Sequence, residues 1–233
     1  MTRSTNQEVA NQKATDQLTV LPTCHEPLEI LRQDEAFVVV NKPSRLLSVP
    51  GRSTWNRDCV IERLRVDFPG VHAVHRLDFD TSGLLVVPLD KPSLSHLSRQ
   101  FQARQVRKTY IAVVHGWVEA EEGRIEEPIA PDADNRPKSK ICAGGKPAVT
   151  DYRVLERDAQ ANTTRLALYP VTGRSHQLRL HCRALGHPIL GCDFYAPEVV
   201  RQMADRLLLH ASELEFAHPV SGDRVQFHCP APF

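Results

Sequence analysis

HRLDFDTSG, residues 75–83, is the stretch of this sequence from which both the fold and the function are best approached. It is the densest polar segment of the chain: an apolar, strand-like segment, residues 71–77, leads into it, and another, residues 84–87, follows. Loops between rigid strands commonly carry active-site residues. Asp78 in this loop can act as a nucleophile or a base if a cation keeps it ionised. The same side chains can also form an ordinary turn by capping backbone groups.

Short apolar segments on both sides of this loop predict further strands. They are bounded by polar or Gly/Pro turns, as strands usually are, and they comprise residues 28–31, 36–40, 110–114, 164–170, 207–210, 213–216 and 224–227. Helical spacing of apolar residues predicts helices at 59–67, 92–105 and 177–185, the second with Asp90 as its N-cap. Strands and helices do not alternate strictly. The sequence therefore predicts an α+β fold with a mixed, mostly antiparallel central sheet flanked by helices and loops.

The ends of the predicted domain follow from composition. Residues 1–26 are rich in Asn, Gln and Thr and poor in apolar side chains, which indicates a flexible polar tail. We expect residues 27–233 to form one domain. Residues 131–147 are polar and contain a Gly-Gly pair, so we expect an exposed loop or hairpin there.

Overall composition indicates a globular, cytoplasmic protein. The chain is 41% hydrophobic and 24% charged, which is ordinary for a globular domain. It has no run of 18 apolar residues, and its first residues contain no apolar core of a secretory signal, so we expect neither a membrane span nor secretion. The 6 cysteines are scattered, which is typical of reduced thiols.

Charge gives only local evidence for a nucleic-acid partner. The 29 Lys and Arg residues nearly balance the 28 Asp and Glu residues, and the net charge is +1. A global basic excess is the usual mark of an RNA-binding protein, so any RNA site must come from local clusters. Such clusters occur at residues 99–108, 136–146 and 174–183, although a single charged run is more often a solvated surface.

Two further segments contain candidate functional residues. In residues 172–181 (TGRSHQLRLH), Arg174 and Arg179 lie where a helix start could bind phosphate or a carboxylate. His176, His181 and Cys182 in the same region do not have zinc-site spacing, so we expect structural histidines and no metal. Tyr110, which enters a predicted strand, is either a core residue or a ring that stacks on a base.

Taken together, these motifs resemble the RluA-type pseudouridine synthase family. HRLDxxTSG at residues 75–83 is similar to its signature, and other matches follow in the family's order: residues 39–44 (VVNKPS), 49–51 (VPG), 108–112 (KTYIA), 172–181, 186–192 (GHPILGC), 209–211 (LHA) and 218–219 (HP). Several ordered motifs are far more specific than one short pattern. The chain departs from the family at Arg45, where Gly usually follows Asn-Lys-Pro-Ser.

The resemblance implies the pseudouridine synthase fold and the isomerisation of uridine in structured RNA, with no cofactor and no metal. It implies that Asp78 is the essential carboxylate. Arg179 would hold Asp78 ionised, with Arg174 as the second choice, because an opposite charge lowers the pKa of an Asp. Tyr110 would stack on the flipped uracil, and Arg76 would occupy the space that the base leaves.

The substrate is predicted from finer features. No S4-like RNA-binding domain precedes residue 27, and residues 134–140 (DNRPKSK) resemble the basic loop of members that modify both 23S ribosomal RNA and the anticodon stem-loop of tRNA. In this loop we expect Arg136, Lys138 and Lys140 to bind RNA and the protein to be a monomer. The alternatives are a synthase for one RNA, a non-catalytic RNA-binding protein, and a hydrolase using Asp78 and Asp80 as paired carboxylates.

Overall fold

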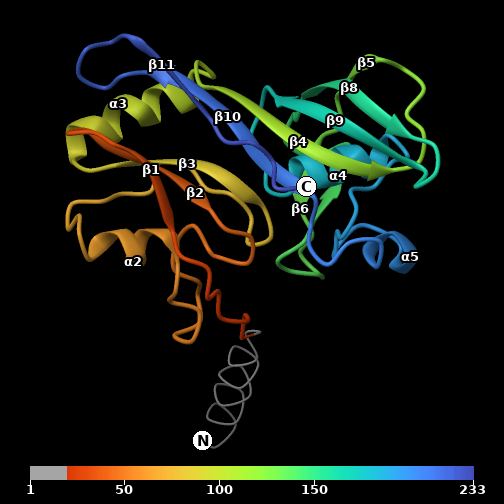
Figure 1. Cartoon of the computed structure of the whole chain (residues 1–233), viewed down its shortest axis with the longest axis horizontal. Coiled ribbons are helices and arrows are strands. Elements are labelled where there is room, and N and C mark those ends of the chain that lie inside the picture. Colours follow the sequence, from red (N-terminus) through yellow and green to blue (C-terminus); the bar gives the residue numbers. More distant parts are fainter. Residues whose placement is uncertain (1–19) are drawn as a thin grey trace, which may run out of the picture.

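The computed structural model describes residues 20–233 (Figure 1). Most of the predicted tail, residues 1–19, lies outside the described residues. Residues 20–26 form no helix or strand, yet Cys24 is buried and the Arg63 guanidinium donates hydrogen bonds to the carbonyls of Cys24 and Glu26. Packed contacts therefore begin before Pro27, because a guanidinium of the body finds its backbone acceptors in this segment.

One nine-stranded sheet organises the described chain, in the order β1-β2-β3-β10-β4-β9-β8-β5 with β11 paired to β10. All neighbouring strands are antiparallel except β3 and β10. The predicted mixed, mostly antiparallel sheet is therefore confirmed. The strands are β1 (Glu29–Gln33), β2 (Phe37–Lys42), β3 (Ser82–Pro88), β4 (Arg107–His115), β5 (Glu122–Ile125), β8 (Thr150–Asp158), β9 (Thr163–Pro170), β10 (Leu209–Ala217) and β11 (Arg224–His228).

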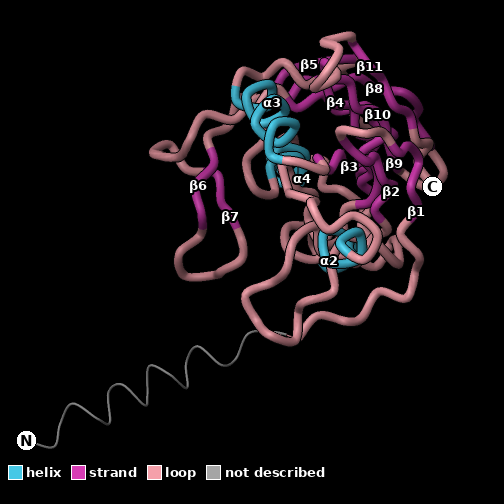
Figure 2. The backbone as a smooth tube through the Cα atoms, turned by 90° about the vertical axis from the view of Figure 1, so that its left-hand side faces the viewer, coloured by secondary structure: helices cyan, strands magenta, loops and turns pink. Residues whose placement is uncertain are grey.

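Helices and a small hairpin complete the fold. The helices are α2 (Val60–Arg65), α3 (Lys91–Gln102), α4 (Gln177–Ala184) and α5 (Glu198–Arg201). Asp90 caps α3 as predicted, since its carboxylate accepts a hydrogen bond from the Ser93 amide at 2.7 Å. Strands β6 (Ile129–Pro131) and β7 (Ser139–Ile141) form a separate two-stranded hairpin that begins just before the polar loop predicted at 131–147 and includes its first half. Figure 2 shows this hairpin extending away from the body of the molecule.

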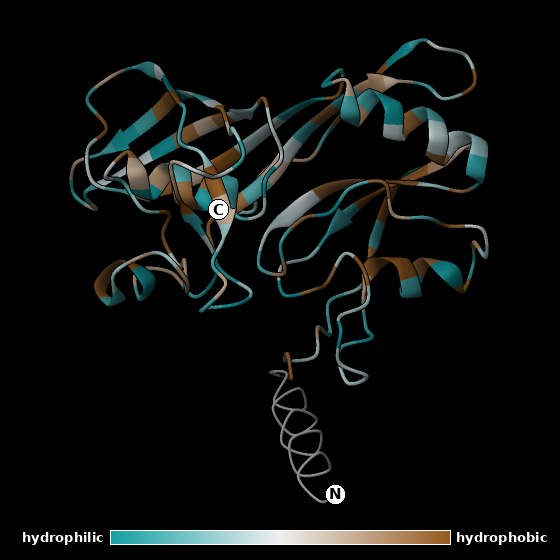
Figure 3. Cartoon of the chain, turned by 180° about the vertical axis from the view of Figure 1, so that it is seen from behind, coloured by the Kyte–Doolittle hydropathy of each residue, from teal (hydrophilic) through white to brown (hydrophobic). Residues whose placement is uncertain are grey.

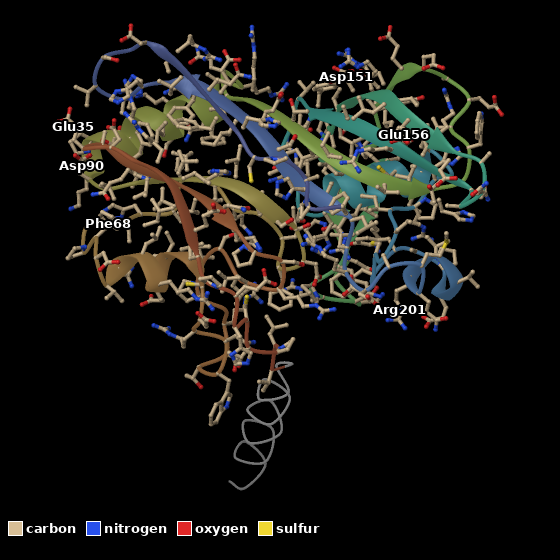
Figure 4. All side chains as sticks on the ribbon, viewed as in Figure 1. Glu35, Phe68, Asp90, Asp151, Glu156 and Arg201 are labelled. Atoms are coloured by element: carbon tan, nitrogen blue, oxygen red, sulfur yellow. The ribbon has the colours of Figure 1, made fainter. Side chains whose placement is uncertain are left out.

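The sheet carries two packed halves, and β4 and β10 run across both of them (Figure 1). In the first half, α2 packs on one face of β2 and β3, and α3 packs on the other. Burial on both faces explains why these two strands are apolar without alternation (FVVV, LLVV). In the second half, α4 packs against β4, β8 and β9. Figure 3 shows the hydrophobic residues concentrated along the strands, and Figure 4 shows the labelled charged residues Glu35, Asp90 and Arg201 at the periphery.

The parallel contact between β3 and β10 joins the two halves just after the Asp78 loop. It consists of only two residue pairs, His210 with Ser82 and Ala211 with Gly83. Gly83 has a φ of +111°, and a Cβ added there would lie 2.3 Å from the carbonyl oxygen of Ala211. Only glycine fits this close approach. The Gly of the HRLDFDTSG stretch is thus fixed by strand packing, and it brings the loop to the join between the halves.

The sequence-based assignment was wrong in two places. Residues 71–77 form no strand, because β3, the strand that follows the loop, already has β2 on one edge and β10 on the other. The segments predicted as two late strands, 207–210 and 213–216, are one strand, β10, with a register shift between Ala211 and Glu213. Such a bulge changes which residues face the core, and so it resembles a strand break in the sequence.

Candidate active site

The loop that carries Asp78 is held by serine hydroxyls from the turn after β2. Ser48 Oγ donates to the carbonyl of Leu77 at 2.9 Å and accepts from the amide of the same residue at 3.0 Å. Ser44 Oγ donates to the carbonyl of Asp80 at 2.7 Å. The backbone on both sides of Asp78 is therefore fixed by buried side chains, which limits where its carboxylate can point.

A fully buried lysine holds the middle of the same loop. Lys42 Nζ donates to three backbone carbonyls, those of Pro43, Leu46 and Phe79, at 2.9, 2.7 and 3.1 Å. Burial lowers the pKa of Lys42 to about 7, against the opposing attraction of Asp80. The three N–H donors of an ammonium match three carbonyl acceptors, so Lys42 connects the end of β2 to the residue after Asp78. Sequence reasoning placed Lys42 in a motif but gave it no role.

Asp78 faces a cavity of about 100 Å³ in which residues from three parts of the chain meet. Arg76 and Asp78 come from the loop, Tyr110 from β4, and Arg174 and Arg179 from the start of α4. The structure therefore brings together all five residues that the sequence predicted for the catalytic centre. Asp80, the second acid of the hydrolase alternative, does not line the cavity, which leaves Asp78 without a paired carboxylate there.

Tyr110 forms part of the floor of this cavity, because its strand is central. It pairs with Ala211 of β10 on one side and with Leu168 of β9 on the other. Burial raises the pKa of Tyr110 above its ordinary value, and the negative charge of Asp78 raises it further. The phenol is therefore protonated at neutral pH and presents an uncharged ring beside Asp78.

The main ionic partner of Arg179 is a residue that sequence reasoning did not consider. The Arg179 guanidinium forms an ion pair with Asp193, and its Nε donates to Cys192 Sγ at 3.3 Å. It also lies over the rings of Phe194 and Tyr195, with centroids at 5.0 and 5.3 Å. The segment after Cys192 thus fixes the position of this guanidinium.

The direct Asp78–Arg179 ion pair expected from the sequence is absent among residues 20–233. The two charges still interact: burial by itself would lower the pKa of Arg179, but Cys192, Asp78 and Asp193 together raise it. The basic side chain that approaches Asp78 within ion-pair range among residues 20–233 is His176, with 4.0 Å between Nε2 and Oδ1. Asp193 takes the pairing position because it follows the turn that packs on α4, a contact between distant segments that a sequence pattern does not show.

His176 connects the cavity to the hairpin. It starts α4 with a left-handed backbone (φ 57°), and its Nδ1 lies 2.5 Å from the hydroxyl of Tyr195. That hydroxyl accepts a hydrogen bond from the amide of Ser139 in β7, so its own proton is available for Nδ1. The proton of a neutral His176 then lies on Nε2, the atom that faces Asp78. Burial lowers the pKa of His176, which favours this neutral form.

Polar residues of α4 are held by hydrogen bonds, and one of them, Gln177, sets the turn that carries Arg174. Gln177 Oε1 accepts hydrogen bonds from the Thr172 hydroxyl at 2.7 Å and from the Arg174 amide at 3.0 Å. His181, considered above as a structural histidine, has both ring nitrogens bonded to protein groups, Thr150 Oγ1 at 2.8 Å and the carbonyl of Glu127 at 3.1 Å. Gln177 thus holds in place the turn through which Arg174 lines the cavity.

Comparison with known proteins identifies the family. A model described as RNA pseudouridylate synthase matches residues 36–184. The chain belongs to this family. The dual-specificity RNA pseudouridine synthases RluA of Yersinia pestis and of Escherichia coli K12 are each 51% identical to it, over 88% of this chain and 99% and 94% of theirs. The solved structure of human RNA pseudouridylate synthase domain containing 1 is 34% identical, with a TM-score of 0.76 over 91% of this chain and 86% of its own.

As a pseudouridine synthase, this chain departs from the family pattern at Arg45 without losing the turn. Arg45 has a φ of 60°, the left-handed conformation in which a Gly carries no steric penalty. Its guanidinium donates to the carbonyl of Asp205 at 2.8 Å. This contact holds the side chain of Arg45 against Asp205 while its backbone keeps the left-handed conformation.

The basic hairpin of this pseudouridine synthase adjoins the cavity through one aromatic ring. Lys138 lies over the ring of Phe194 at 5.4 Å, and Arg179 contacts the same ring. Arg136 is exposed near the tip, whereas Lys140 forms an ion pair with Asp132 at 3.3 Å. The hairpin residues do not line the cavity itself. In residues 20–233, no helix is long and apolar enough to cross a membrane.

Proposed function

We propose that this protein converts specific uridines to pseudouridine in structured RNA, with Asp78 as the catalytic carboxylate. The observation that carries the proposal is the cavity in which Asp78, the only acidic residue of its lining, meets a buried tyrosine and several cations. The reaction breaks the glycosidic bond of uridine and rejoins the base through C5. The target base must leave its stack to reach such a cavity, and that costs least in RNA loops.

Four other residues of the cavity have distinct roles in this proposal. Tyr110 stacks on the flipped uracil, because its ring is uncharged and held by central strands. Arg179 keeps Asp78 ionised through space while Asp193 holds the guanidinium in place. Arg174 contacts the RNA backbone at the cavity wall. Arg76 is exposed beside Asp78 and enters the space that the base leaves.

The basic hairpin supplies RNA contacts outside the cavity. Arg136 and Lys138 carry the larger share, since neither has a carboxylate partner among the described residues. Lys140 contributes less, because its ammonium is already paired with Asp132. Phosphate contacts of this kind fix the register of the RNA without reading its sequence.

The substrates are proposed from the relatives. Proteins named dual-specificity RNA pseudouridine synthase are 51% identical to this chain over most of its length. We infer that this protein likewise modifies two RNAs, 23S ribosomal RNA and the anticodon stem-loop of tRNA, and that it works as a cytoplasmic monomer. Pseudouridine mapping of total RNA from cells with and without the gene tests the substrates: loss of sites in only one RNA class would overturn dual specificity.

The reaction is tested with Asp78→Asn, a nearly isosteric change that removes the negative charge. We expect turnover of purified stem-loops to fall at least 10³-fold while folding and RNA binding persist. Asp67→Asn, at an exposed residue outside the cavity, is the matched control. Near wild-type turnover of Asp78→Asn would show that Asp78 is not the catalytic carboxylate.

Product analysis distinguishes the alternative functions. A synthase converts uridine and leaves the RNA mass unchanged, a hydrolase releases uracil, and a non-catalytic RNA-binding protein leaves uridine intact.

A further inference from the structure

Lys108 lies where two cavities meet. It precedes Tyr110 by two positions on β4, so both side chains lie on the same face of the strand, about 7 Å apart along it. It lines the Asp78 cavity and also a second cavity of about 400 Å³, which Arg104 and Arg107 line as well. Pro170 is likewise common to both, so the two cavities adjoin at Lys108.

The ammonium of Lys108 has no partner within residues 20–233. It forms none of the ion pairs or side-chain hydrogen bonds that its neighbours form: Arg107 pairs with Glu215 at 3.5 Å, and the Thr109 hydroxyl donates to Glu213 at 2.7 Å. Those two carboxylates belong to β10 and are already engaged. Burial lowers the pKa of Lys108, and no carboxylate opposes the shift.

The charges around Lys108 favour an anion at this point. Asp78 is the only acid of the first cavity, and Arg179, the most buried of its cations, is balanced by Asp193. The second cavity is lined by three acids, Asp151, Glu213 and Glu215, which disfavour an anion there. An anion is therefore held best on the side of Lys108 that lines the Asp78 cavity, next to the ring of Tyr110.

We infer that Lys108 binds a backbone phosphate of the substrate RNA beside the flipped uridine. The inference rests on the proposed function, since RNA brings the phosphate. A flipped nucleotide carries its own phosphates to the cavity mouth, and an ammonium is a point charge suited to one of them. Contact with phosphate supplies the counter-charge that the protein does not provide. Lys108 is thus a positioning residue, which sets how deeply the base enters above Tyr110.

The first test combines Lys108→Met, Lys108→Arg and the control Lys91→Met, at an exposed lysine that begins α3. RNA affinity is measured at several salt concentrations, together with thermal unfolding. We expect Lys108→Met to weaken binding about tenfold to a hundredfold and to reduce the salt slope by about 0.7, the loss of one phosphate contact. Lys108→Arg restores binding, and Lys91→Met changes nothing.

Thermal unfolding separates this role from a structural one. Removal of an unpaired, half-buried charge should leave the melting temperature of Lys108→Met unchanged or higher. A melting temperature that falls together with affinity, or a salt slope equal to that of the wild type, would overturn the inference. So would a loss of kcat with unchanged affinity, because Lys108 would then act in the chemistry.

The second test locates the phosphate and separates the two proposals. The affinity for a stem-loop with an uncharged methylphosphonate next to the target uridine is compared with the affinity for the unmodified stem-loop. Two proteins are used, Asp78→Asn and the double variant Asp78→Asn/Lys108→Met, because neither turns the RNA over. We expect the methylphosphonate to weaken binding by the protein that retains Lys108 and to have no further effect on the protein with Lys108→Met; additive losses overturn the inference. If the protein with Asp78 intact forms no pseudouridine while this binding pattern is found, the proposed function is refuted and the phosphate contact stands.

Discussion

The Asp78 loop and the β6–β7 hairpin differ in how they are held, although both adjoin one cavity. Buried donors from β2 and the following turn fix the loop: Lys42 is 0% exposed and Ser48 is 3% exposed. The hairpin has most of residues 131–137 exposed, and its base is anchored by Ile129 in the hydrophobic core and by contacts with Tyr195 and Phe194. Figure 2 shows the hairpin standing away from the rest of the molecule. The Asp78 loop, by contrast, leads directly into β3 of the sheet.

This difference indicates that the Asp78 loop controls catalysis and that the hairpin controls RNA affinity. Catalysis needs a carboxylate whose position does not change when RNA arrives, because misplacement of a reacting group by about 1 Å can cost about 10²-fold in rate. RNA binding tolerates adjustment, since phosphate contacts depend mainly on charge. Changes in the loop and its supports should therefore act on kcat, and changes in the hairpin on affinity and its salt dependence.

Arg179→Ala should have the largest effect, because Arg179 acts on Asp78 through space and lies on the same Phe194 ring as Lys138 of the hairpin. Its side chain is 2% exposed and pairs with Asp193, which is 45% exposed. Removal leaves Asp193 without its cation and Asp78 without a compensating charge. We expect the free energy of unfolding to fall by about 3 kcal/mol, the low end for buried pairs because Asp193 is partly solvated. Urea unfolding and single-turnover kinetics measure the two losses.

Asp193→Asn tests whether catalysis depends on the ion pair of Arg179 with Asp193 or on the effect of Arg179 on Asp78. If Arg179 keeps Asp78 ionised, Asp193→Asn removes a competitor and costs much less activity than Arg179→Ala, while both lower stability. Equal losses of activity would mean that the Arg179–Asp193 pair, and not its field at Asp78, is what catalysis requires. Wild-type unfolding and turnover in Arg179→Ala would show that the guanidinium supports neither region.

Lys42→Met tests the rigid region and should have the next largest effect. Without the ammonium, the carbonyl of Phe79 is released, and we expect kcat to fall about 10²-fold with little change in RNA affinity. Affinity that falls as much as kcat would contradict the division of roles. Leu97→Met, a volume-conserving change at a buried residue of α3, is the control for general core perturbation.

The same variant gives a pH dependence with a definite sign. Burial lowers the pKa of Lys42 to about 7 from 10.5, so between these values the folded protein binds fewer protons than the unfolded chain. Stability then rises with pH across this window, and the contribution is lost as pH falls through 7. The free energy of unfolding of the wild type minus that of Lys42→Met should therefore increase from pH 7 to pH 10. A flat difference would show that the three carbonyls keep Lys42 charged.

How far the sequence could predict this site depends on the range of each contact. The Asp78 loop is local: a dense polar stretch with its terminal Gly83, and it was found at once. Ordered motifs also linked Tyr110 and Arg179 to it, and the cavity confirms that these residues meet. Their grouping came from resemblance rather than from periodicity, because residue spacing contains no information on which loops face each other.

The supports of the site could not be predicted in this way. Ser48 and Leu77 are 29 residues apart, and Arg179 and Asp193 are 14 apart in different elements. His176 was considered only as a metal ligand or a structural residue, and nothing in its neighbourhood along the chain indicates that it faces Asp78. Such contacts depend on sheet topology, and the parallel pairing of β3 with β10 that sets them was not predicted.

Arg136→Ala should have the smallest effect, and it tests the exposed side of the comparison. Arg136 is exposed on the hairpin, so we expect a change in stability within about 0.5 kcal/mol. RNA affinity should fall a few-fold and the salt slope by about 0.7, while kcat at saturating RNA stays the same. Arg153→Ala, at an exposed arginine of β8 that lines neither cavity, is the control. A fall in kcat at saturation would mean that the hairpin acts on the chemistry. The hydrogen bonds from Ser139 to Tyr195 and from Tyr195 to His176 lead toward Asp78, which lies 4.0 Å from His176 Nε2. The loop and the hairpin would then be coupled, and their different exposure would not mean that one controls catalysis and the other RNA binding.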